Sequence, residues 1–189
     1  MRILIPASGV TAVVDETAAF GVRDLETGGF VLVPRSSSAD GGSPVVVIAL
    51  AGDTGIVRDR GLFQISERAL DRIFAFADDH DLWIPAQFHS HKVDAFLSRT
   101  DQRHGLCVEE FISAVIPTYA SPPRDLARWG WWQFASGAWR DTEPGRVTDR
   151  TVEVVRFDEA GVRGVLPFAH AAAGGTRNRN TAVRARTPA

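Results

Sequence analysis

Two histidines and an aspartate occur together in the segment from Phe88 to Arg103, which reads FHSHKVDAFLSRTDQR. His89 and His91 are separated by one residue, and alternate side chains of an extended strand point to the same face, so both imidazoles can reach a common point. With Asp101 they form a nitrogen and oxygen ligand set of the kind that zinc accepts. Three protein ligands leave a fourth position open for water, so the pattern predicts a catalytic rather than a structural zinc site.

Ser98 precedes Asp101 by three residues, which is the spacing of a helix start. A serine hydroxyl caps such a turn, and a carboxylate three residues later lies against the positive end of the helix. We therefore expect a helical turn to begin at Ser98.

Hydrolysis at such a site also needs a residue that moves protons, and the motif itself offers no such group. Among the upstream acids, Glu26 stands out because it precedes the glycine pair Gly28–Gly29, at the head of an apolar run to Val33. Glycines let backbones approach closely, and this strand should enter the core. We expect Glu26 to face the site.

The elements that position these residues follow from hydrophobic periodicity. Apolar residues at helical spacing predict one helix that ends at Gly21, and a second that opens at Ser66 and Glu67 and ends around Asp78–His80. Composition and apolar runs predict further strands. These cover residues 2–6, 45–50, 61–65, 83–88, 111–117, 129–134 and 151–157.

Composition sets the limits on organisation and partners. The 189 residues suit one domain with a substantial core, and a net charge of −2 gives no reason to expect nucleic acid. The single cysteine, Cys107, excludes a disulfide framework, and no apolar run approaches the roughly 20 residues of a membrane span. We expect a domain over residues 1–168 in a reducing cytoplasm. A basic tail, 169–189, is too poor in apolar residues to fold.

Together, Glu26-Thr-Gly-Gly, His89-Ser-His91 and Ser98-Arg-Thr-Asp101 resemble the JAMM signature of the JAB/MPN metalloprotease family, of the Mov34/MPN/PAD-1 type. The resemblance covers about residues 1–160 and implies an α/β (α+β) fold of the cytidine-deaminase-like kind, with a mixed, curved sheet flanked by helices. It implies that the two histidines and Asp101 bind Zn²⁺, that Glu26 is the acid/base, and that Ser98 helps to hold the oxyanion.

Members of that family cleave isopeptide or peptide bonds at the C-terminus of ubiquitin-like proteins. The resemblance thus predicts a zinc metalloprotease with a ubiquitin-like protein or its conjugate as substrate, and E1- or E2-like enzymes as candidate partners. Two departures concern loop shape and substrate fit more than metal binding. Lys92 stands where the family usually has proline, and the spacer between His91 and Ser98 holds six residues, one fewer than usual.

Other interpretations remain open at the level of sequence. The histidines could also be ordinary strand residues without a metal. Asp101 could serve only as an acidic residue at a helix start, and Glu26 only as an acidic residue in a turn. A non-catalytic MPN-type scaffold, or a zinc hydrolase of small amide or sulfur-carrier substrates, would carry the same residues.

Three further features have simpler explanations than a functional one. We expect His104 to be a solvated helix residue and Cys107 a buried small residue. The tryptophans at 129, 131 and 132 are expected to belong to the core.

Overall fold

The computed structural model describes residues 2–37 and 42–164. Residues 165–168 of the expected domain and the expected tail, 169–189, lie outside the described residues.

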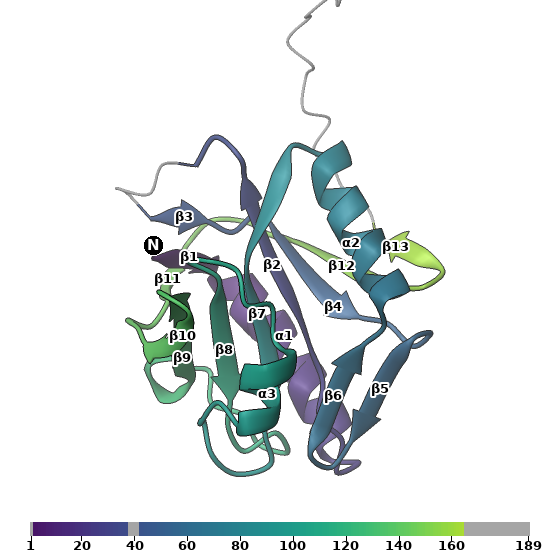
Figure 1. The fold of residues 1–189 in the computed structure, drawn as a ribbon, viewed down its shortest axis with the longest axis vertical. Coiled ribbons are helices and arrows are strands. Elements are labelled where there is room, and N and C mark those ends of the chain that lie inside the picture. The colour runs from purple at the N-terminus through teal and green to yellow at the C-terminus, as the bar shows by residue number, and fades with distance from the viewer. Residues whose placement is uncertain (1, 38–41, 165–189) are drawn as a thin grey trace, which may run out of the picture.

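A single eight-stranded sheet dominates the described structure (Figure 1). Its strands lie in the order β10-β9-β8-β7-β2-β4-β12-β13, with β7–β8 and β4–β12 parallel and the other neighbours antiparallel. The strands are β2 (Gly28–Pro34), β4 (Val47–Ala51), β7 (Leu82–Ser90), β8 (Ile112–Ile116), β9 (Gly130–Ala135), β10 (Ala138–Asp141), β12 (Glu153–Asp158) and β13 (Gly161–Arg163). β7, which carries the histidine motif, therefore lies in the interior of the sheet.

Each face of the sheet is covered by one long helix. Along β2, side chains alternate between two cores, so that Phe30 and Leu32 belong to one cluster and Val31 and Val33 to the other. The first cluster includes residues of α2 (Glu67–Asp79), and the second includes residues of α1 (Ala7–Gly21). The protein is thus a mixed α+β structure in which a large mixed sheet lies between two helices.

Smaller elements complete the fold around this sheet. β1 (Ile3–Pro6), β3 (Ser43–Pro44) and β11 (Arg146–Thr148) form a separate parallel sheet, and β5 (Ile56–Asp59) and β6 (Leu62–Ile65) form a two-stranded hairpin. The short helix α3 (Arg99–His104) follows the histidine motif, and a 3₁₀ turn, η2, spans Leu126–Arg128. In Figure 1, α3 and the hairpin lie toward the same end of β7.

Each strand predicted from composition overlaps a strand of the structure, and both predicted helices are present. Ser66 caps α2 as expected, with its hydroxyl accepting a hydrogen bond from the Ala69 N–H at 3.2 Å. β3, β5, β10, β11 and β13 were not predicted, because strands of two to four residues carry little periodic signal. β1 and β6, also four residues long, were predicted from composition.

The expectation that Cys107 is buried is wrong, because its side chain is exposed in the loop after α3. The expected core role of the tryptophans is confirmed for Trp129 and Trp131, which are buried and stack with ring centroids 6.0 Å apart. Trp132 is only half-buried. Among the described residues, no helix has both the length and the apolar character to cross a membrane.

Candidate metal centre

His89 and His91 lie at the end of β7, where pairing on both sides holds the backbone. His89 is opposite Gly28 of β2 and Val115 of β8. The His91 N–H donates a hydrogen bond to the Ile116 carbonyl at 2.8 Å, just beyond the last residue of the strand. Because only Ser90 separates the two histidines on this extended backbone, their side chains project toward the same side.

Asp101 reaches the histidines from the first turn of α3. Ser98 and Asp101 form a capping box, in which the Ser98 hydroxyl accepts from the Asp101 N–H at 3.1 Å and the Asp101 carboxylate accepts from the Ser98 N–H at 2.8 Å. The expected helical turn at Ser98 is confirmed. This reciprocal cap fixes the carboxylate as well as the start of the helix.

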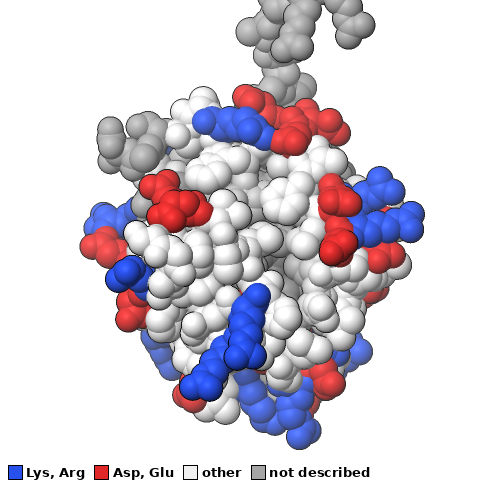
Figure 2. Space-filling model, in the orientation of Figure 1, with Lys and Arg blue, Asp and Glu red and all other residues white. Residues whose placement is uncertain are grey.

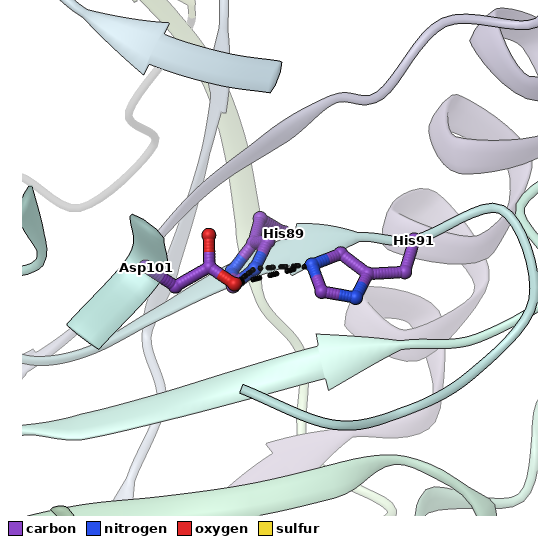
Figure 3. Close-up of side chains that lie close together, drawn as sticks. All are labelled: His89, His91 and Asp101. Atoms are coloured by element: carbon purple, nitrogen blue, oxygen red, sulfur yellow. Dashed lines mark hydrogen bonds and ion pairs between the residues drawn. The ribbon is translucent and has the colours of Figure 1, made fainter. Parts of the chain in front are cut away.

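The three side chains converge on one point (Figure 3). The His89 and His91 Nε2 atoms lie 3.1 Å apart, and the Asp101 Oδ2 atom lies 3.5 Å from the first and 3.3 Å from the second. A tetrahedral metal ion with ligand bonds of about 2.0–2.1 Å has ligand atoms about 3.3 Å apart. The triangle therefore fits three corners of such a site, and it is the one three-residue group of this kind within residues 2–37 and 42–164.

The electrostatics of the group favour a bound cation. Burial alone would raise the pKa of Asp101, but hydrogen bonds with His89 and His91 outweigh it and hold this pKa well below its usual range. Burial alone would lower the pKa of His91, yet the hydrogen bond with Asp101 and the nearby carboxylate charges raise it above its ordinary value. The Asp101 carboxylate is therefore charged, and this negative charge beside the two imidazoles favours a bound cation.

Residues of the loop that follows the histidines contact the His91 imidazole. A hydrogen bond links His91 to the backbone of Asp94, and the Phe96 ring lies edge-on to the imidazole with a centroid distance of 5.3 Å. Metal-ligating histidines in proteins commonly use the second ring nitrogen in this way, which fixes the orientation of the ring. The shortened spacer therefore still anchors the imidazole.

Glu26 is brought to the same region by pairing between its own segment and the histidine motif. The Thr27 N–H donates to the Ser90 hydroxyl at 3.0 Å, and the Ser90 N–H donates to the Thr27 carbonyl at 2.9 Å. Ser90 lies between the two histidines, so the residue next to Thr27 is held opposite them. On the other side, the Glu26 N–H donates to the Asp59 carbonyl of the hairpin at 3.0 Å.

The Glu26 side chain is 6% exposed, and its burial raises its pKa to about 7. The charge of His91 lowers this pKa and that of Asp101 raises it, so the carboxyl group lies within electrostatic range of both. A carboxyl group with a pKa near neutrality is suited to exchanging protons at physiological pH. Glu26 does not belong to the group of converging ligand atoms.

A cavity of about 270 Å³ opens beside the converging ligand atoms. His89 and Asp101 line one part of it, Leu62–Ile65 of β6 contribute another, and Thr100 and His104 of α3 also border it. His104 is exposed, as expected for a solvated helix residue, yet it faces this cavity. On the molecular face where α3 and β6 lie, Figure 2 shows mainly uncharged side chains over the centre, with basic side chains just below them.

The sequence indicated the converging residues but not the cavity wall formed by β6 or the network around Asp24, Lys92 and Tyr119 described below. Only the unusual Lys92 marked that network in the sequence. The remaining contacts join segments far apart along the chain, and no local pattern reports them.

No protein-family model and no curated protein matches this chain. Among solved structures, the chain is similar to a protein of Desulfitobacterium hafniense at 13% identity and a TM-score of 0.59, covering 79% of this chain and 94% of the other. It is also similar to a protein of Salinibacter ruber at 19% identity and a TM-score of 0.51, covering 77% and 91%. At these identities the similarity shows a shared mixed α+β fold.

Proposed function

We propose that this protein is a zinc metalloprotease of the JAB/MPN type, with the cytidine-deaminase-like fold of that family, that cleaves the isopeptide or peptide bond after the C-terminus of a ubiquitin-like protein. One observation carries the proposal. His89, His91 and Asp101 present ligand atoms at tetrahedral spacing, while the separate buried carboxyl group of Glu26 is held opposite them.

Zinc is the ion that this ligand set favours. Two imidazole nitrogens and one carboxylate oxygen, spaced for a four-coordinate ion, match the ligand types and geometry of zinc better than the oxygen-rich octahedral sites of magnesium or calcium. Three protein ligands leave one position, which suits catalysis rather than a purely structural role.

When bound, zinc would acidify a water molecule and polarise the scissile carbonyl. The Glu26 carboxylate accepts the proton of the attacking water and then returns it to the departing amine. A cation beside Glu26 lowers the pKa of this carboxyl group, so the residue is ionised at neutral pH when the reaction begins. The Ser98 hydroxyl accepts from the Asp101 N–H, which leaves its own O–H free to donate to the developing oxyanion.

The cavity gives the substrate chain a path to these residues. Within the described residues, β6 pairs with β5 alone, so its other edge is available to an extended chain. Added-strand pairing reads the backbone of a peptide and tolerates many sequences. A C-terminus that ends in Gly-Gly, as in ubiquitin-like proteins, brings no side chain into the part of the cavity next to His89 and Asp101.

Metal analysis of the purified full chain, produced with ample zinc, tests the proposal first. We expect about one zinc per chain, and His91→Ala should lower this content sharply because two remaining ligands hold the ion poorly. Cleavage is then measured on ubiquitin-like fusions and isopeptide conjugates, with small acyl amides in parallel. A protein that binds no metal contradicts the proposal. A protein that binds zinc but cleaves only small amides contradicts the proposed ubiquitin-like substrate.

A further inference from the structure

The carboxylate of Asp24 is bonded by three side chains from three different segments. The Lys92 ammonium donates to Asp24 Oδ1 at 2.7 Å, and the Tyr119 hydroxyl and the Arg60 guanidinium donate to the same carboxylate. We call Asp24, Arg60, Lys92 and Tyr119 the Asp24 cluster. The hydrogen bonds from Lys92 and then Tyr119 hold the pKa of Asp24 well below its usual range, so the carboxylate is charged.

Each donor of the Asp24 cluster belongs to a segment that also contacts the candidate metal centre. Lys92 directly follows His91, and the Tyr119 N–H donates to the His91 carbonyl at 3.1 Å. Arg60 follows Asp59, whose carbonyl accepts from the Glu26 N–H. The cluster therefore ties the Glu26 segment to the end of β7 and to the hairpin at once.

The backbone of Asp24 has a conformation that needs such support. Its φ is +60°, a left-handed conformation that few residues other than glycine adopt, although aspartate and asparagine are among the more tolerant. Asp24 thus turns the chain after α1 and directs it toward Glu26, two residues later. Residues in sparsely populated conformations persist where surrounding contacts hold them, and here those contacts are the three donors.

We propose that Asp24 is a positioning residue that, through Lys92 and Tyr119, holds the Glu26 carboxyl group in register with the histidine motif. The catalytic part of this inference rests on the proposed function, whereas its structural part does not. Asp24 itself is not among the converging ligand residues. The lysine that replaces the usual proline of the motif is then the partner that the Asp24 carboxylate requires.

Hydrogen exchange of the zinc-loaded full chain tests the structural part without any substrate. Asp24→Asn tolerates the left-handed backbone but loses the charge, and Tyr119→Phe removes one donor hydroxyl. We expect the amides of Glu26 and Thr27 to exchange about tenfold faster in Asp24→Asn, and less so in Tyr119→Phe, because local opening becomes easier. Exchange of the α2 amides should stay unchanged.

Asp15→Asn is the matched control, because it removes a different ion pair, between Asp15 of α1 and Arg124, whose atoms lie 3.1 Å apart and which includes no member of the Asp24 cluster. It should leave exchange at Glu26 and Thr27 at the wild-type rate. Unchanged exchange in both Asp24→Asn and Tyr119→Phe would overturn the inference, whatever the activity of these variants.

A double-mutant cycle tests the catalytic part. Asp24→Asn should lower kcat about tenfold with little change in KM and in zinc content, and should cause no further loss in a Glu26→Gln background, since it acts through that residue. If the double variant instead loses kcat by the product of the two single losses, Asp24 does not act through Glu26, and this part of the inference is wrong. If the wild-type protein cleaves no ubiquitin-like substrate, the proposed function fails, and the exchange rates alone decide whether Asp24 positions the Glu26 segment.

Discussion

The Glu26 carboxyl group lies within electrostatic range of His91 and Asp101, but it is absent from the group of ligand atoms that lie within 4.8 Å of one another. The residues of the site therefore have separable tasks. Three side chains could hold a metal ion, and the proposed function assigns proton exchange to a fourth, Glu26, which is buried and has a pKa of about 7. Single substitutions distinguish these tasks because metal content and turnover are measured independently.

Glu26→Gln keeps the size and hydrogen-bonding capacity of the side chain but cannot accept a proton at neutral pH. Zinc content should stay near the wild-type value. Turnover of a ubiquitin-like fusion should fall by ~10²–10⁴-fold, the range of a positioned acid/base. Loss of zinc from this variant would make Glu26 a ligand, and undiminished cleavage would place the base elsewhere.

Ser98→Ala removes both a proposed oxyanion donor and the cap of α3. We expect turnover to fall by ~10²–10³-fold through the lost donor. The free energy of unfolding should fall by about 1 kcal/mol through the lost cap. Steady-state kinetics and chemical denaturation measure the two effects.

Ser66→Ala is the control for that substitution, because Ser66 caps α2 in the same way and the cavity is not lined by it. It should cost a similar free energy of unfolding and leave kcat unchanged. An equal loss of turnover in both variants would show that Ser98 acts through helix stability alone.

At the scale of elements, the approach of β2 to its neighbours decides where Glu26 lies. Gly29 is opposite Phe88 of β7, and a Cβ at Gly29 would lie 2.1 Å from the Ala49 carbonyl oxygen of β4. No side chain fits in that space without displacing a strand. The glycine pair after Glu26 therefore permits the close strand packing on which the site depends.

Gly29→Ala should lower the free energy of unfolding by about 1–3 kcal/mol, as expected for overpacking. It should also lower zinc affinity, because the added Cβ would push β2 away from β4 and displace the ring of Phe88, the residue next to His89. Gly61→Ala is the matched control, since a Cβ there meets nothing within 4 Å. Denaturation midpoints and zinc titrations on both variants provide the comparison. Equal stability of the two would mean that β2 and β4 can separate at little cost.

For the whole molecule, the buried acid makes stability depend on pH when metal is removed. The pKa of Glu26 is about 7 in the folded protein, against 4.5 for an ordinary glutamate. The folded state therefore holds the proton more strongly than the unfolded chain. The stabilisation of the folded state by protonated Glu26 is complete below pH 4.5 and is lost as the pH rises through 7.

Between pH 4.5 and 7.5, the free energy of unfolding of metal-free wild-type protein should fall by about 3 kcal/mol more than that of metal-free Glu26→Gln, at 1.36 kcal/mol for each unit of pKa. Urea denaturation of both proteins at several pH values measures the difference. Groups that are common to both proteins and do not interact with Glu26 contribute equally. Parallel pH profiles would contradict a buried, protonated Glu26.

Local backbone geometry explains what could be predicted from the amino-acid sequence. The period of a strand places His89 and His91 on one side, and the three-residue spacing of a helix cap places Asp101 beside Ser98, so the ligand set follows from contacts between near neighbours. The long strands and both long helices were predictable for the same reason, because each repeats its pattern over several residues.

Contacts between segments that are distant in the sequence decided the features that could not be predicted. The reciprocal Thr27–Ser90 hydrogen bonds join residues 63 apart in the chain, and only the order of strands in the sheet brings them together. The same holds for the β6 wall of the cavity and for Asp24, which meets Tyr119 across 95 residues. Such approaches depend on the packing of the entire core, to which each residue contributes a little. No single stretch of sequence therefore encodes them.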